Sequence, residues 1–287
     1  MRSRSLIPDP RSLISRRINA ERIVLLGWGR AILLQLAHPL IAAGVHDHSG
    51  FRATTWAAVT RLYHTVHAML ALTFGTDEER ARALGGIRQI HQRVHGQLRS
   101  AAGRFPAGTE YSAENPDLVL WVHATLLESV PLAYEQLVGP LTMAERDAYC
   151  AEAAPLAVAL LARSDEVPRN WADTCVYLDR MYASGDLVVS DEARALARAV
   201  LSPAAAGWIA SPATWANRIV TLGLLPPSIR RQYGFEWTRG HRLTFNVLVR
   251  ALRTARRVTP DVLALWPEAS INHPTSPIPN QSEIINH

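Results

Sequence analysis

The feature that most constrains this chain is a helical periodicity of its apolar residues, which recurs along almost the whole length. No stretch with the two-residue period of a strand is longer than a few residues, and residues 10–268 show neither an internal repeat nor a linker. Apolar residues make up 48% of the 287 positions, which is enough to fill a large core. The sequence therefore predicts an all-α fold, a single-domain bundle of many helices.

Capping and helix-breaking residues divide this pattern into segments. Thr76 precedes three acidic residues, Thr142 and Glu145 form a capping box, and Pro116 suits the first position of a helix. Residues 1–268 are expected to form the helical domain, and 269–287, rich in Pro, Asn and Ser, a disordered C-terminal tail. The expected helices cover residues 20–37, 40–45, 55–74, 76–101, 116–138, 142–163, 174–183, 191–201, 211–224, 228–233, 238–257 and 260–265, with loops at 46–51 and 103–109.

The charge pattern argues against a nucleic-acid partner. The net charge is +5, every cation is Arg, and the arginines are spread from Arg2 to Arg257 instead of forming a basic stripe or a known binding motif. The two cysteines, Cys150 and Cys175, have neither the spacing of a zinc site nor the density of a disulfide scaffold, so we expect reduced thiols.

The apolar stretch from Ile23 to Val45 does not have the composition of a membrane span. It carries Arg30, His38 and Pro39, whereas a spanning helix needs about 20 residues nearly free of charge. We interpret it as buried core with functional polar groups and expect no stable membrane insertion. The expected location is cytoplasmic, with loose association with a membrane as the alternative.

Histidines are the most informative polar residues, because eight of the eleven lie between His38 and His123. His91 and His95 are spaced i,i+4, so a helix continuing to residue 101 would place both on one face, where they could bind zinc. The general-base Glu of the HExxH motif is missing, and no acidic cluster resembles a di-iron site. A non-haem metal site is therefore the less favoured alternative.

A haem site requires less of the sequence: one neutral imidazole on a helix, an apolar slot and a cation for the propionates. His91 meets this description, with Ile87, Ile90 and Val94 beside it and Arg88 one turn before. An ordinary hydrogen-bonded histidine is the competing interpretation.

Two further groups share helix faces. Arg61, His64 and Thr65 lie within a sector of about 100° on a helix, where they could line the distal side of a cofactor or form a solvated face. Trp121 and Thr125 also share a face, which indicates either cofactor contact or ordinary helix packing. Neither a GxSxG nucleophile elbow nor a GxGxxG phosphate loop is present.

Several ordered motifs over about residues 15–260 resemble the MpaB-type oxygenase family, which is related to the latex clearing proteins, or rubber oxygenases. The motifs are Gly29 to Pro39, then Gly44-Val45 and His48-Ser49, Arg61-Leu62 with Thr65, Leu72 to Gly75, Ile90-His91 with Val94-His95-Gly96, Tyr111 to Ala113, Pro116 to Leu118 and Trp121 to Thr125.

The resemblance implies an all-helical protein that binds haem b, with His91 as the proximal ligand and the metal-binding residue. Latex clearing proteins place Arg-x-x-Lys-Thr on the distal side, and here the same spacing has Arg61, His64 and Thr65 as the catalytic candidates. The imidazole that replaces Lys could hydrogen-bond bound oxygen or ligate the iron itself. The expected cofactor contacts besides the ligand are Arg88, His38, Trp121 and Thr125.

The function expected from this resemblance is a haem-b-dependent oxygenase that uses dioxygen to cleave C=C bonds of, or insert oxygen into, an apolar substrate such as an isoprenoid chain. The alternative is a non-catalytic haem or apolar-ligand binding protein or sensor, with iron held by both His91 and His64. A homodimer and a separate electron donor are both compatible with the sequence.

Overall fold

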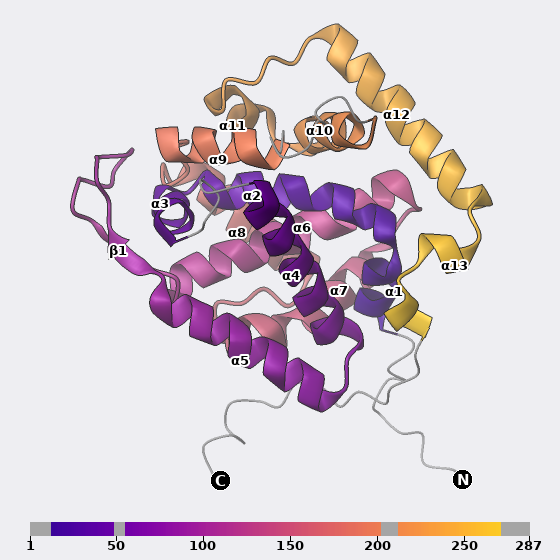
Figure 1. Ribbon diagram of the computed structural model, residues 1–287, viewed down its shortest axis with the longest axis horizontal. Coiled ribbons are helices and arrows are strands. Elements are labelled where there is room, and N and C mark those ends of the chain that lie inside the picture. Colours follow the sequence, from indigo (N-terminus) through magenta and orange to yellow (C-terminus); the bar gives the residue numbers. More distant parts are fainter. Residues whose placement is uncertain (1–12, 49–54, 202–211, 271–287) are drawn as a thin grey trace.

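The computed structural model describes residues 13–48, 55–201 and 212–270, and it is all-α, as the sequence predicts (Figure 1). A two-stranded antiparallel sheet, β1 His95–Gln97 with β2 Glu110–Ser112, projects from one side. The described helices are α1 Ile14–Ala20, η2 Arg22–Gly27 (3-10), α2 Trp28–Leu36, α3 Pro39–His48, α4 Thr55–Phe74, α5 Asp77–Arg93, α6 Pro116–Leu137, α7 Met143–Ala159, α8 Trp171–Ala183, α9 Asp191–Leu201, α10 Pro212–Leu224, α11 Pro227–Gln232, α12 Arg239–Val258, α13 Asp261–Ala264 and η4 Pro267–Ser270 (3-10).

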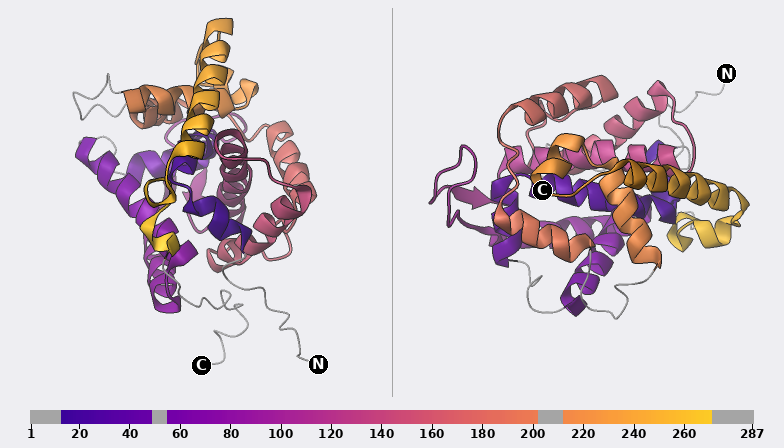
Figure 2. Two further views of the ribbon diagram at one scale, coloured as in Figure 1. Left: turned by 90° about the vertical axis from the view of Figure 1, so that its right-hand side faces the viewer. Right: turned by 90° about the horizontal axis from the view of Figure 1, so that it is seen from above.

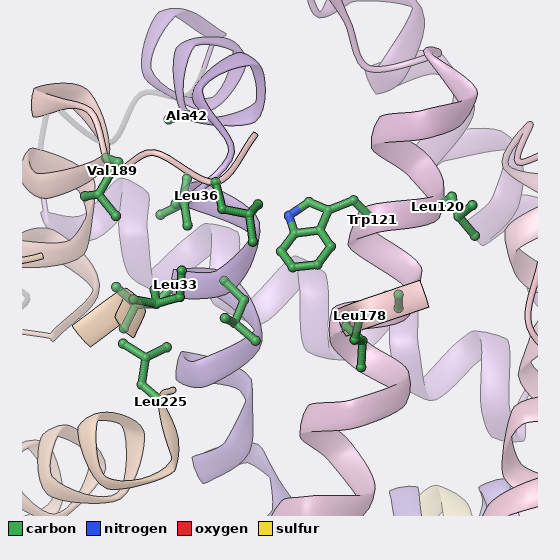
Figure 3. Close-up of a cluster of buried hydrophobic side chains, with 14 of the residues drawn as sticks. Leu33, Leu36, Ala42, Leu120, Trp121, Leu178, Val189 and Leu225 are labelled. Atoms are coloured by element: carbon green, nitrogen blue, oxygen red, sulfur yellow. The ribbon is translucent and has the colours of Figure 1, made fainter. Parts of the chain in front are cut away.

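The centre of the fold is α6, which packs against α2, η2, α7, α8 and α12. The Asn115 side chain accepts a hydrogen bond from the backbone of Asp117, and Pro116 takes the first helical position, so local sequence sets the start of α6. The indole of Trp121 projects from α6 toward the leucines of α2, among them Leu33 and Leu36, in the largest buried cluster (Figure 3). This helix pair is the framework on which the polar groups are placed.

The predicted helix from residue 76 to 101 is too long. The capping box of Thr76 and Glu79 opens α5 as predicted, but α5 ends at Arg93 and Val94 is already extended. The amide of Ala113 donates to the Val94 carbonyl at 2.9 Å, which begins the pairing of His95–Gln97 with Glu110–Ser112. Pairing with a segment fifteen residues away therefore overrides the local helical pattern.

Other differences lie at element ends. The first expected helix is divided into η2 and α2, α3 continues to His48 over part of the predicted loop, and α1 precedes the region where helix was predicted. Residues 269 and 270 belong to η4, and the rest of the predicted tail lies outside the described residues. Both cysteines are free thiols, as expected.

Among the described helices, none is by itself long and apolar enough to cross a membrane. The pair Arg22–Leu36 and Pro39–His48 reaches that length and composition only together, and it is bent by 107° at the break.

Candidate functional site

His91 lies in the last turn of α5, two residues before the helix ends. Its ring is half-buried, and desolvation lowers the pKa of the imidazole, with the nearby carboxylate of Glu114 partly opposing that shift. Among the described residues, none forms a hydrogen bond with the ring. His91 therefore presents a neutral imidazole with nitrogen lone-pair capacity still available.

The hairpin that follows fixes the end of α5 against α3. A Cβ on Gly44 of α3 would lie 3.2 Å from Val94 Cγ1, and His48 Nε2 is 3.0 Å from the carbonyl oxygen of His95. A Cβ on Gly96 would lie only 2.6 Å from the hydroxyl oxygen of Tyr111, so a larger residue there would have to displace the Tyr111 ring. These close approaches hold the chain around His91 in one arrangement.

The structure separates His91 from His95. His95 is the first residue of β1 and is exposed, with its ring 6.5 Å from that of His48, so the predicted helix face carrying both histidines does not form. Within the part of the chain that the structure describes, no group of three or more His, Cys, Asp or Glu side chains could hold a metal ion. The less favoured alternative, a zinc site at His91 and His95, was therefore wrong in its geometry.

The neighbours of His91 on α5 only partly form the predicted slot. Ile87 and Val94 are half-buried, whereas Ile90 is exposed. Arg88 is exposed on the same helix, where its guanidinium can meet an anionic group. The apolar lining at α5 is thus narrower than the sequence pattern indicated.

The predicted distal residues lie on α4, which packs beside α5. His64 and Thr65 are exposed, and the His64 ring is 5.7 Å from that of Tyr63. The backbone of Arg61 is helical, as predicted, and its side chain lies outside the described part of the structure. The two groups of predicted residues therefore lie on adjacent helices.

His38, Trp121 and Thr125 are buried in the core, and Trp121 and Thr125 belong to α6 itself. The hydroxyl of Thr125 donates to the backbone carbonyl of Val122 at 2.7 Å. It accepts a hydrogen bond from the side-chain amide of Gln35 at 3.0 Å. His38 stacks obliquely on Phe105, 5.3 Å between ring centroids. The structure does not bring these three residues into described contact with His91.

Three aromatic or imidazole side chains of the core each bury a polar atom that has no partner in the described structure. Trp121 Nε1, His38 Nδ1 and His123 Nε2 are buried and have no hydrogen-bond partner in the described structure. Desolvation lowers the pKa of both His38 and His123 to about 4, although the charge of Asp186 works against the shift at His38. No role was predicted for His123, which in the sequence is an imidazole on an otherwise apolar helix face within the motif from Trp121 to Thr125.

One cleft opens near the C-terminal end of α3, away from His91. The hydroxyl of Tyr111 donates to Asp47 Oδ2 at 2.9 Å, and Arg99 donates to Asp47 Oδ1 at 2.8 Å. The cleft is lined by Pro39, Ala43, His46, Asp47, Leu98, Arg99, Ser100, Ala102, Ser190 and Glu192. This cleft includes neither His91 nor any residue of α4, so it is not the predicted haem pocket.

The protein is all-α, and desolvation keeps two of its buried histidines, His38 and His123, in the neutral form. The chain belongs to the family described as ER-bound oxygenase mpaB/B'/rubber oxygenase, catalytic domain, which matches residues 15–254. The protein is thus a member of an oxygenase family and an oxidoreductase by that membership.

Two curated mycobacterial proteins are similar to this chain. The uncharacterized protein Mb2261 of Mycobacterium bovis and the uncharacterized protein Rv2237 of Mycobacterium tuberculosis are each 28% identical to it over 237 residues, covering 80% of this chain and 87% of theirs. No solved structure matches the chain.

Proposed function

We propose that the protein is a haem-b-dependent oxygenase that acts on an apolar substrate with dioxygen, and that His91 would hold the haem iron. The observation that carries the proposal is the half-buried, neutral imidazole of His91, which no described residue hydrogen-bonds. It lies on a helix within the segment that matches the oxygenase family. An imidazole kept neutral by desolvation is ready to ligate iron without first losing a proton.

The donor set suits a haem. One neutral helix imidazole, the half-buried side chains of Ile87 and Val94, and the exposed guanidinium of Arg88 correspond to the ligand, the apolar contact and the propionate partner that a haem needs. When bound, haem supplies redox chemistry that allows dioxygen to react with a carbon–carbon double bond or a C–H bond.

The chain's own residues would bind and orient the reactants. His91 would hold the cofactor at the end of α5, and Arg88 would bind one of its carboxylates. On the adjacent α4, His64 and Thr65 would polarise oxygen, and Arg61 would balance developing negative charge or hold a propionate. Apolar walls would exclude water and orient an isoprenoid-like chain.

The alternative is a haem carrier or sensor in which His64 also ligates the iron. The observation that favours it is the position of His64 on a helix packed beside α5. Iron held by both histidines would lack a free position for dioxygen, so this alternative predicts a protein that is slow to bind external ligands.

The absorption spectrum of the purified protein tests the proposal, recorded before and after dithionite and then carbon monoxide. We expect a Soret band that shifts with carbon monoxide, and we expect His91→Ala to lose stoichiometric haem and to regain it with added imidazole. The matched control is His95→Ala, because this exposed histidine on β1 is separate from α5. Stoichiometric haem in His91→Ala, or no Soret band even after haem is added to the wild type, contradicts the proposal.

A further inference from the structure

The outer surface of α12 and α13 combines exposed apolar side chains with unpaired cations. α12 lies on the outside of the molecule in all three views, with α13 following its C-terminal end (Figures 1 and 2). We call this surface the α12 face. Its large apolar residues are Leu243, Val247, Val258, Val262 and Leu263, which are 66%, 56%, 78%, 80% and 64% exposed.

The inner side of α12 is fixed to the body of the protein, so the exposure of the α12 face is not a sign of a detached helix. A Cβ on Gly223 would lie 2.2 Å from the ring of Phe245, which shows how closely α10 and α12 pack. Val249 is buried, and the guanidinium of Arg256 donates twice to Glu21, at 2.6 and 2.8 Å. The apolar face therefore points outward on a rigid support.

Helical geometry gathers the apolar residues of α12 into one stripe. At 100° per residue, Leu243, Val247 and Val258 fall within a sector of about 60°. Arg250 and Arg257 fall within about 40° of Leu243 on one side of that stripe. Both are exposed, as are Arg239 and Arg242 at the N-terminal end of the helix.

The charge of α12 has one sign. The helix contains six arginines and no acidic residue. Of these, Arg256 is occupied by Glu21 and Asp261, whereas no ion pair joins the four exposed arginines to any residue that the structure describes. The α12 face thus needs a partner that is apolar at its centre and anionic at its border.

We propose that the α12 face docks on the surface of a bilayer that contains anionic phospholipids. In that position Leu243, Val247 and the apolar residues of α13 would enter the boundary between headgroups and acyl chains, while the arginines would lie at the level of the phosphates. A basic amphipathic helix with an apolar face is typical of this binding mode. Helix α12 would lie in the plane of the interface, and the protein would remain peripheral.

A second copy of the chain fits this face less well. Two α12 faces packed on each other would bring arginines against arginines, with no acidic side chain of α12 to separate them. A nucleic acid could pair with the arginines, but its phosphate backbone would leave the five apolar side chains without a partner.

Vesicle co-sedimentation with the full-length protein tests this proposal. The probes are vesicles of phosphatidylcholine alone and of phosphatidylcholine mixed in equal parts with phosphatidylglycerol. We expect binding to the mixed vesicles that weakens with added salt, and little binding to the neutral ones. Loss of each arginine should weaken binding about fivefold.

The informative variants are Leu243→Asp with Val247→Asp, and Arg250→Ser with Arg257→Ser. The matched control is Val176→Asp with Arg198→Ser, which changes an exposed valine on α8 and an exposed arginine on α9. Circular dichroism establishes that each variant is folded, and the haem spectrum gives a readout independent of membrane binding. Equal binding by the α12 and control variants overturns the proposal. Absence of wild-type binding overturns it too, as does a wild-type dimer in solution that Leu243→Asp with Val247→Asp converts to monomer.

Discussion

Arg30 of α2 and Glu128 of α6 form an ion pair inside the protein, with 2.8 Å between Arg30 Nη2 and Glu128 Oε2. The same guanidinium donates from Nη1 to the hydroxyl of Ser129 at 2.6 Å and from Nε to the Leu224 carbonyl at 2.8 Å. Only 2% of the Arg30 side chain is exposed. One buried cation therefore joins α2, α6 and α10, the helices that form the framework of the fold.

Replacing Arg30 with methionine should destabilise the protein by about 3 kcal/mol, because Glu128, Ser129 and the Leu224 carbonyl lose the guanidinium at once while most of the side-chain volume is kept. The urea dependence of circular dichroism measures the free energy of unfolding. The matched comparison is Arg163→Met, because Arg163 pairs with Asp117 and Glu166 on the surface, and such pairs contribute little. An equal shift of the urea midpoint in both variants would show that the burial of Arg30 does not determine how much its ion pair contributes to the free energy of unfolding.

Gly29→Ala and Gly86→Ala should change the free energy of unfolding in opposite directions, although both glycines lie inside helices. A Cβ at Gly29 would lie 2.2 Å from Thr221 Oγ1, and both residues are buried, so we expect a loss of about 1–3 kcal/mol from overpacking. A Cβ at Gly86 meets nothing within 4 Å, so alanine should stabilise α5 by about 1 kcal/mol through its higher helix propensity. Thermal unfolding of the two variants checks this. A Gly29→Ala protein as stable as the wild type would mean that α2 and α10 approach less closely than the structure has them.

Stability should fall as the pH drops below 6.5, because two histidines are buried in the neutral form. Burial lowers the pKa of His38 and of His123 from 6.5 to about 4, so between these values the unfolded chain binds protons that the folded protein does not. The histidine contribution is therefore complete above pH 6.5 and decreases by about 1.4 kcal/mol per pH unit for each histidine as the pH falls toward 4.

His123→Leu separates the two contributions, because leucine fills much of the space and does not titrate. We expect the dependence of the free energy of unfolding on pH, measured in urea between pH 7 and pH 5, to be about half as steep as in the wild type. An unchanged slope would mean that His123 titrates equally in the folded and unfolded chains.

Local signals made much of the fold predictable. The bounds of α4 and α9 match those expected, and the starts of α5, α6 and α12 follow from capping at Thr76, Asn115 and Thr238 that involves only neighbouring residues. The end of α5 was not predictable in this way. It depends on the pairing of Val94 with Ala113 and on contacts between hairpin and α3, which no window of sequence contains.

The candidate site was likewise predictable only where it depends on local sequence. The position of His91 on a helix was predicted from the periodicity of its own segment, and so was the helix that carries His64. The exposure of Ile90 and the separation of His95 from His91 depend on how α5 meets β1. The helical pattern of the sequence predicted both incorrectly. The burial of His123 was not predictable from its own segment, because its desolvation arises from several helices packed around α6.

His64 gives the sharpest test of the chemistry at the α4–α5 pair. If the protein is an oxygenase, His64→Ala should leave the spectrum of the reduced protein before carbon monoxide unchanged, because the imidazole is not a ligand. It should also lower oxygen uptake with an isoprenoid substrate about a hundredfold, the cost of losing one aimed donor. The control is His67→Ala, since His67 is exposed on the same helix with its ring 4.0 Å from that of Tyr63. A reduced spectrum that becomes five-coordinate in His64→Ala, together with faster carbon monoxide binding, would instead assign the protein as a carrier or sensor.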